Sequence, residues 1–249
     1  MRIVVKQTAE EVDLTAAQEV AKQLLLRPES VLGLSTGNTV VGLHRALVKL
    51  HRECGISFAR ALTFNVDEYA GVAPGHPGSC RLRIFEQLLD CVDIRSEQCH
   101  LPDGEAEDFE REARAYEQRI EEAGGIDLQI LGIGTNGHIG FNEPGTPFES
   151  GTHVAVISGR SLSDKAEFYR KTGFAPQKAI TLGIRNIMRA RRILLVAKGA
   201  AKTEIMEKTL FGPVTPDVPA SVLQLHPDTI VFLDSAAAGA GITSRGNWE

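Results

Sequence analysis

The sequence predicts an α/β protein: a doubly wound, mostly parallel sheet with helices on both faces, in the manner of a Rossmann-like fold. Short all-apolar segments, such as residues 31–34 and 193–196, alternate with longer segments of helical apolar spacing. Strands that are apolar on both sides are typical of parallel sheets covered by helices. No linker rich in Pro, Gly or Ser divides the chain, so residues 1–249 are expected to form a single domain.

The elements follow from the apolar spacing in chain order. A strand at 3–5 precedes a helix over 9–26, whose apolar positions Val12, Ala16, Val20 and Leu24 recur at helical spacing. Further strands are predicted at 31–34, 61–66, 126–133, 179–182, 193–196 and 230–233, and helices at 40–50, 79–92, 105–123 and about 200–210. Residues 144–176 have weak periodicity and are expected to form a mobile lid. The Ala/Gly-rich tail after Asp234 is expected to fray.

Composition narrows the class of function. Lys+Arg is 27 and Asp+Glu is 32, and the net charge of −5 argues against broad binding to nucleic acid or to an anionic membrane. No run reaches the roughly 18 apolar residues of a membrane span, and the N-terminus lacks the apolar core of a secretory signal. None of the 4 cysteines has CxxC spacing. Reduced thiols and a cytoplasmic location are therefore expected.

Polar clusters follow three of the predicted strands, at residues 35–39, 65–69 and 134–143. In an open parallel sheet, ligands bind outside the carboxyl ends of the strands. The three clusters are therefore expected to meet in one site.

The first cluster joins a strand to a helix through the sequence GLSTGNT. Backbone amides at a helix start, with hydroxyl groups beside them, favour an anion at Gly37, Asn38 and Thr39. The segment is neither GxGxxG nor a GK[ST] loop, so neither a dinucleotide nor ATP is indicated. The alternative is an ordinary helix cap made by Asn38 or Thr39.

Lys202 stands at the start of the helix predicted at about 200–210. A cation there opposes the helix dipole, which makes sense if an anion lies between them. The alternative is a solvated lysine.

The second cluster contains the adjacent carboxylates Asp67 and Glu68. In an extended segment they point to opposite sides, so one of them can face a ligand and act as a general base. The alternative is a solvated loop.

The third cluster places His138 and Glu143 in a loop with four glycines among residues 134–145. A carboxylate that tunes a histidine suggests a proton-transfer pair, whereas the alternative is a flexible turn. The remaining histidines have no ligand spacing such as HExxH, so no metal is expected.

The stretches GLSTGNT, FNVDEY, HPGS, GGIDLQILGIGTNGHIGFNEPGTPF, AITLGI and PASVLQLHPD occur in this order along nearly the whole chain. In these stretches the chain resembles the glucosamine-6-phosphate deaminase (isomerase) family. The related 6-phosphogluconolactonases share the fold but not the GFNEPG ending. The resemblance implies hydrolytic conversion of D-glucosamine 6-phosphate to D-fructose 6-phosphate and ammonia, without a cofactor. Its expected partner is that small phosphorylated amino sugar, bound by a monomer or a homo-oligomer.

The resemblance also implies a role for each matching residue. His138 opens the sugar ring, and Asn136 and Glu143 orient and tune it. Asp67 moves a proton from C2 to C1. Gly37, Asn38, Thr39 and Lys202 bind the phosphate.

Three departures from the family pattern affect these expectations. Many members have aspartate at the position of Asn136, and an amide can orient His138 but cannot supply charge. Gly151 and His153 replace basic residues that hold an effector in regulated members, which suggests an unregulated enzyme. A phosphate-binding lid arginine aligns with Glu167, so Lys165 or Arg170 is expected to replace it.

Three other functions stay open on the sequence. The closest in chemistry is a galactosamine-6-phosphate deaminase, whose relatives also diverge around residues 150–170. A 6-phosphogluconolactonase needs no C2 base such as Asp67. A non-catalytic sugar-phosphate sensor would not need the catalytic set, and no helix-turn-helix accompanies this domain.

Overall fold

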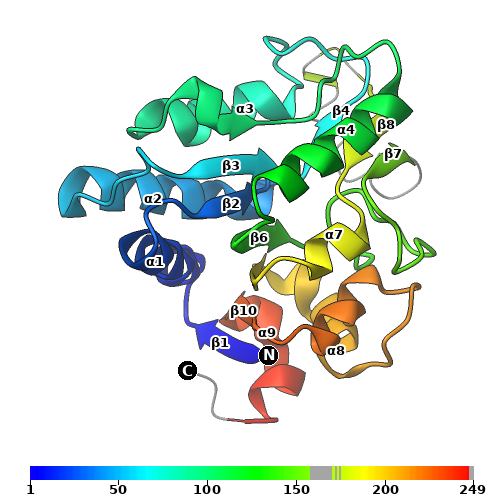
Figure 1. Ribbon diagram of the computed structural model, residues 1–249. Coiled ribbons are helices and arrows are strands. Elements are labelled where there is room, and N and C mark those ends of the chain that lie inside the picture. Colours follow the sequence, from blue (N-terminus) through cyan, green and yellow to red (C-terminus); the bar gives the residue numbers. More distant parts are fainter. Residues whose placement is uncertain (158–169, 172, 174, 247–249) are drawn as a thin grey trace.

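A parallel sheet of seven strands forms the centre of the fold (Figure 1). In the computed structural model, residues 1–246 are described apart from 158–169, 172 and 174. Neighbouring strands of this sheet run parallel in the order β1-β10-β9-β6-β2-β3-β5. The strands are β1 (Arg2–Lys6), β2 (Val31–Leu34), β3 (Leu62–Asn65), β5 (Cys99–His100), β6 (Leu128–Gly132), β9 (Arg192–Ala197) and β10 (Thr229–Asp234). The predicted parallel sheet is confirmed, and only the two-residue strand β5 was not predicted.

Helices cover both faces of this sheet, as predicted. One hydrophobic core packs the sheet against α1 (Ala9–Leu26), α2 (Val41–Cys54) and α3 (Cys80–Gln87). A second core packs it against α4 (Phe109–Glu122), α7 (Ile184–Met188), α8 (Thr203–Phe211) and α9 (Ser235–Thr243). The two cores explain why the strands are apolar on both sides.

Local chemistry fixes where α1 begins. The Thr8 side chain accepts a hydrogen bond from the Glu11 backbone amide at 3.2 Å, and the Glu11 carboxylate accepts one from the Thr8 amide at 3.0 Å. This reciprocal pair is a capping box, which satisfies amides that the first helical turn leaves without partners. The helix predicted at 9–26 is confirmed with both of its ends.

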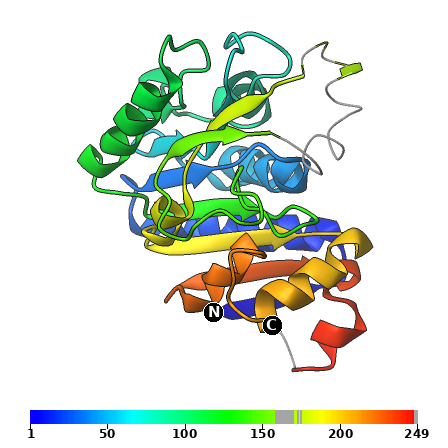
Figure 2. The same cartoon turned by 90° about the vertical axis from the view of Figure 1, so that its right-hand side faces the viewer.

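A second, smaller sheet is antiparallel and has the order β4-β8-β7. Its strands are β4 (Asp67–Tyr69), β7 (His153–Val156) and β8 (Lys178–Thr181), and Figure 2 shows β7 and β8 running side by side beyond the main sheet. The strand predicted at 179–182 therefore exists but does not join the parallel sheet. A short buried apolar run is expected both for a strand of the parallel sheet and for a buried strand of a small antiparallel sheet, so the periodicity of the sequence could not distinguish the two.

The expectation that the tail after Asp234 frays was wrong for its first part: residues 235–243 form α9, where Ala237, Ala238 and Ile242 are buried. Residues 247–249 lie outside the described part of the chain. The Asp234 carboxylate caps the helix by accepting a hydrogen bond from the Ala237 amide at 2.7 Å. The small alanine side chains that suggested disorder let the helix pack closely on the sheet.

The predicted lid at 144–176 is described only in part. Residues 153–156 of this segment form β7, whereas Lys165 and Glu167 lie outside the described residues. Lid motion stays a prediction. Across the described part of the chain, no helix has the length and apolar content needed to cross a bilayer.

Gly183 provides a test of the packing between β8 and the turn that precedes β7. A Cβ on Gly183 would lie 2.0 Å from the Gly151 carbonyl oxygen and 2.1 Å from that of Ser150, and backbone atoms yield little. We expect Gly183→Ala to lower the free energy of unfolding by about 1–3 kcal/mol, the usual cost of overpacking. Chemical denaturation of the wild type and the variant measures this difference in the free energy of unfolding.

The matched control is Gly75→Ala, because a Cβ at Gly75 meets nothing within 4 Å. It should change stability by less than about 0.5 kcal/mol. Equal stability of the two variants would contradict the described packing at Gly183.

Candidate active site

The order of the parallel strands contains a switch point between β2 and β6. From β2 the chain proceeds outward through β3 and β5, and from β6 it proceeds the other way through β9 and β10. Ligands of open α/β sheets bind at such a point, outside the carboxyl ends of the strands. The Ser35 hydroxyl, just after β2, donates a hydrogen bond to the Ile130 carbonyl of β6 at 2.7 Å. The first and third predicted clusters therefore begin at adjacent strand ends.

The segment of Gly37, Asn38 and Thr39 forms a single 3₁₀ turn, Asn38–Val40, ahead of α2. Asn38 and Thr39 do not cap α2, whose N-cap residue is Val40, so the predicted alternative of a side-chain cap is not what the structure shows. Gly37 and Asn38 are exposed. Thr39 lies over the end of β6, since a Cβ on Gly132 would be 3.4 Å from the Thr39 Cβ. The turn therefore offers polar groups above the switch point.

Lys202 lies at the carboxyl end of β9, the neighbour of β6. It ends the 3₁₀ turn Ala200–Lys202 and takes the N-cap position of α8, as its place in the sequence predicted. The turn that carries Thr39 also contacts the end of β9. Both predicted anion-binding segments thus stand at the same edge of the sheet.

Asp67 and Glu68 point to opposite sides of β4, as predicted. Glu68 is buried, and burial raises the pKa of its carboxyl group against the opposing effect of hydrogen bonds from backbone amides and from Ser79. Asp67 is only partly buried. Of the two carboxylates, Asp67 is the one that a ligand can reach.

His138, Asn136 and Glu143 form one hydrogen-bonded cluster. The Asn136 side-chain oxygen accepts from the His138 backbone amide at 3.2 Å and contacts the His138 Nδ1 at 2.7 Å. The Asn136 side-chain nitrogen donates to the Glu143 Oε2 at 2.6 Å, and the Glu143 Oε1 lies 3.4 Å from the His138 Nδ1. The sequence had predicted that these residues meet, and they do.

This geometry determines which ring nitrogen of neutral His138 carries the proton. A backbone amide can only donate, so the Asn136 atom that it contacts is the oxygen. That oxygen carries no hydrogen, so the His138 Nδ1 must donate to it. The lone pair of neutral His138 is therefore on Nε2, and a carboxylate lies near Nδ1 to stabilise the ring once it is protonated.

The loop of residues 134–145, the glycine loop, is anchored to β8, the strand that pairs with the strand of Asp67. The Phe141 amide donates to the Thr181 hydroxyl at 3.1 Å, and Thr181 is the register partner of Asp67 between β8 and β4. Gly140 has φ +60° and a Cβ there would lie 2.8 Å from the Thr181 Oγ1, so a side chain would be excluded. Thr181 thereby fixes the His138 loop beside the strand of Asp67.

Sequence reasoning missed residues that support the predicted set. Thr181 anchors the loop, Arg83 donates to the Asn38 side-chain oxygen at 3.3 Å, and the Cys80 sulfur lies 3.6 Å from the Asp67 Oδ1. Two stretches that resemble the family were signals for them: AITLGI contains Thr181, and HPGS comes just before Cys80. Nothing in the sequence distinguishes Arg83.

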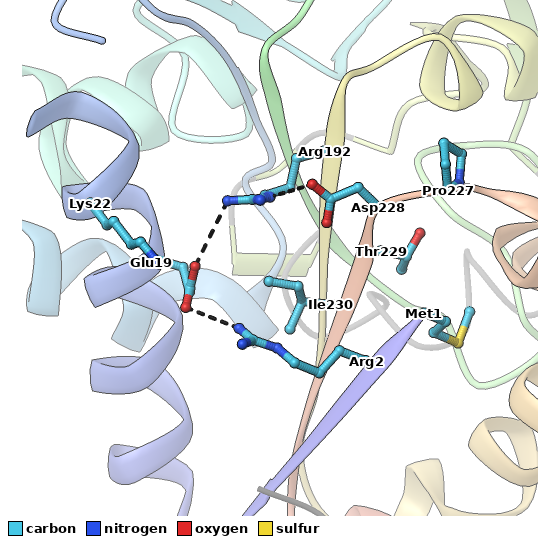
Figure 3. Close-up of a pocket in the computed structure, with 9 residues that line it drawn as sticks. All are labelled: Met1, Arg2, Glu19, Lys22, Arg192, Pro227, Asp228, Thr229 and Ile230. Carbon is cyan, nitrogen blue, oxygen red and sulfur yellow. Dashed lines mark hydrogen bonds and ion pairs between the residues drawn. The ribbon is translucent and has the colours of Figure 1, made fainter. Parts of the chain in front are cut away.

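A different cavity, of about 330 Å³, lies at the amino ends of β1, β9 and β10 and contains none of the predicted site residues (Figure 3). Four of its charged groups pair with one another: Glu19 contacts Arg2 at 3.0 Å and Arg192 at 3.9 Å, and Arg192 contacts Asp228 at 2.8 Å. These pairs fasten α1 to the sheet. Within the described ranges, no three His, Cys, Asp or Glu side chains gather in a group that could hold a metal ion.

Comparison with known proteins gives a consistent result. Residues 4–232 match the family described as glucosamine-6-phosphate isomerases/6-phosphogluconolactonase. The chain is 43% identical over 238 residues to a glucosamine-6-phosphate deaminase of Thermoanaerobacter pseudethanolicus, covering 96% of this chain and 94% of the relative. It is 46% identical over 237 residues to that of a Geobacillus species, covering 95% and 94%.

Solved structures agree. A monomeric glucosamine-6-phosphate deaminase matches with a TM-score of 0.93 at 40% identity, covering 96% of this chain and 99% of that chain. A 6-phosphogluconolactonase from Trypanosoma brucei, 19% identical with a TM-score of 0.77, covers 95% and 97% and shares the fold. The fold, the polar cluster at its switch point and these matches lead to one conclusion: the chain belongs to the glucosamine-6-phosphate isomerase/6-phosphogluconolactonase family.

Proposed function

We propose that the protein is a glucosamine-6-phosphate deaminase, which converts D-glucosamine 6-phosphate and water to D-fructose 6-phosphate and ammonia in amino-sugar catabolism. The observation that carries the proposal is the joining of two acid–base groups through Thr181. The loop of His138 is bonded to the hydroxyl of Thr181, and Thr181 pairs with Asp67. The relatives at 43% and 46% identity bear the name of this enzyme.

Ring opening is assigned to His138. Its Nε2 takes the proton of the anomeric hydroxyl and delivers it to the ring oxygen, which breaks the C1–O5 bond and leaves the open-chain aldehyde. The imidazole is positively charged between these two transfers. The carboxylate of Glu143, 3.4 Å from Nδ1, lowers the energy of that cation, and Asn136 holds the imidazole ring in place.

Isomerisation is assigned to Asp67. Its carboxylate removes the proton from C2 of the open-chain sugar while a proton of the protonated amine passes to the carbonyl oxygen at C1, which gives the enolamine. The proton from C2 is then returned to C1, which gives the protonated 2-imine of fructose 6-phosphate. Water then adds at C2 and ammonia leaves. These proton transfers are acid–base steps, and no electron is gained or lost, so no cofactor is required by this mechanism.

Asn136 can serve in place of an aspartate because Glu143 supplies the negative charge. An aspartate at this position could not donate the 2.6 Å hydrogen bond that Asn136 gives to Glu143, and two carboxylates would then face each other. The amide therefore keeps the histidine oriented and leaves one charge in the cluster.

The phosphate is assigned to the amides and side chains of Gly37, Asn38 and Thr39 with the ammonium group of Lys202. Backbone amides at a helix start bind anions although the amides carry no net charge, and Lys202 adds a positive charge beside them. Arg170 is exposed and Lys165 lies outside the described residues, so the group that replaces the lid arginine stays a prediction.

We also infer that the enzyme is unregulated and monomeric. Gly151 has no side chain to hold an effector, and the nearby Arg185 guanidinium is paired with Glu117 at 2.7 Å. His153 contacts the Gly151 carbonyl oxygen through Nδ1 at 2.9 Å. The similar solved deaminase is described as monomeric.

The first test measures ammonia and fructose 6-phosphate, or tagatose 6-phosphate, from glucosamine 6-phosphate and galactosamine 6-phosphate in parallel. We expect the gluco epimer to be preferred by about tenfold or more in kcat/KM, the range that differential hydrogen bonding to one hydroxyl supports. Faster turnover of the galacto epimer would favour the alternative deaminase. No product from either sugar would contradict the proposal.

The second test replaces the base. Asp67→Asn keeps the shape of the side chain but cannot accept the C2 proton, so kcat should fall by about 10²–10⁴-fold while KM changes little. Steady-state kinetics measure both values. The control is Asp103→Asn, an exposed aspartate that should leave both values unchanged. Near-normal turnover of Asp67→Asn would refute the assignment.

The third test separates ring opening from isomerisation. His138→Gln should slow turnover of the closed sugar by about 10²–10⁴-fold, whereas an analogue held in the open-chain form should lose much less. Rates on the two substrates are compared, with His51→Gln as the control because His51 bonds to the Ile56 carbonyl away from the cluster. An equal loss on both substrates would refute the ring-opening role of His138.

A further inference from the structure

Glu68, the buried neighbour of Asp67, binds the start of helix α3 to strand β4. Its Oε1 accepts hydrogen bonds from the backbone amides of Tyr69 at 2.7 Å and Cys80 at 2.9 Å. Its Oε2 accepts from the amide of Arg81 and the hydroxyl of Ser79, each at 2.8 Å. Two of these donors are the first amides of α3, which have no partner within the helix. One carboxylate therefore sets the position of α3 relative to β4.

The first residue of α3 is Cys80, whose sulfur lies 3.6 Å from the Asp67 Oδ1. An ionised carboxylate only accepts hydrogen bonds, so in this contact the thiol must be the donor. Cys80 is 2% exposed, and burial at this level keeps the thiol from turning into solvent. The mechanism proposed above gives this thiol no role.

Two other groups near Asp67, Tyr116 and the Asn65 side chain, donate to backbone oxygens. Tyr116 of α4 acts on Asp67 electrostatically, but burial raises the pKa of its phenol well above the usual range, and its hydroxyl donates to the backbone carbonyls of Asn65 and His100. The Asn65 side chain donates to the backbone oxygen of Asp67, not to its carboxylate. On Asp67's own strand, the Glu68 carboxylate points to the other side and is occupied by α3.

We propose that Cys80 is a positioning residue for Asp67: its thiol donates a hydrogen bond to the Asp67 Oδ1, and Glu68 holds the thiol there by fixing the start of α3 against β4. This inference rests on the proposed function, because it assigns Cys80 to the base of that reaction.

The physical reason is the softness of the carboxylate torsion. The terminal torsion of an aspartate is broad, so each hydrogen bond to one of its oxygens restricts the exchange of the two. A donor on Oδ1 holds the carboxylate plane in one orientation toward the substrate carbon. It also favours the ionised form, which is the form that removes a proton.

The test compares Cys80→Ala with Cys80→Ser. Alanine removes the donor, and we expect kcat on glucosamine 6-phosphate to fall by about five- to twentyfold with KM nearly unchanged, since hydrogen bonds to charged groups are the stronger class. The acidic limb of the kcat/KM profile should move to higher pH by about half a unit. Serine restores a donor and should return both values to within about threefold of the wild type.

A deuterium label at C2 supplies a readout that a merely structural role would not move. If Cys80 aligns the base, Cys80→Ala makes proton removal from C2 slower relative to the other steps, and the isotope effect on kcat rises. The matched control is Cys99→Ala. Cys99 is also buried, but its thiol donates to the Arg95 carbonyl, so its loss should change thermal stability without changing the isotope effect.

The outcomes distinguish the inference from the function on which it rests. If the wild type is active but Cys80→Ala keeps its kcat, acidic limb and isotope effect, the positioning role is wrong. An equal loss in Cys80→Ser and Cys80→Ala would also overturn it, because the effect would then come from the volume of the sulfur. A wild type that releases no ammonia overturns the proposed function, and this inference with it.

Discussion

The backbone of Val66 connects the two sheets, and the candidate site depends on this connection. Its amide donates to the Leu34 carbonyl in the parallel sheet at 2.8 Å, and its carbonyl accepts from the Leu182 amide at 2.8 Å. The next residue is Asp67, the first of β4. The chain thus leaves the parallel sheet at the point where Asp67 comes to lie beside β8, whose Thr181 also holds the glycine loop. Without this crossing, Asp67 and His138 would belong to separate strand ends.

The Glu143 carboxylate lies beside the His138 ring, and the Asn136 amide connects the two. Asn136 both accepts and donates, so it links His138 to Glu143 and leaves one carboxylate to stabilise the protonated ring. Asp67 is supported in a different way, through a thiol on a helix that Glu68 fixes in place. Two acid–base groups with separate supporting contacts suit a reaction whose two proton transfers occur at different atoms of one sugar.

The chain sequence predicted much of the site because polar residues follow strands whose carboxyl ends must share one edge of a parallel sheet. That rule brought together residues 35–39 and 134–143, and it held. It could not place β8, because Ala179 and Ile180 are equally buried in a parallel or an antiparallel strand. The expectation from composition failed for α9, where the small side chains that are typical of disorder instead allow close packing.

The sequence by itself determined the fold class, the candidate residues for proton transfer and the glycines that let their loop turn, because these depend on residue type and on local spacing. The tertiary structure alone decided which groups touch. The tautomer of His138 depends on the orientation of the Asn136 amide, and the surroundings of Asp67 depend on Thr181, Glu68 and Cys80. These contacts join residues from different strands and helices, and their distances follow from how the two sheets and α3 pack, which no local pattern records.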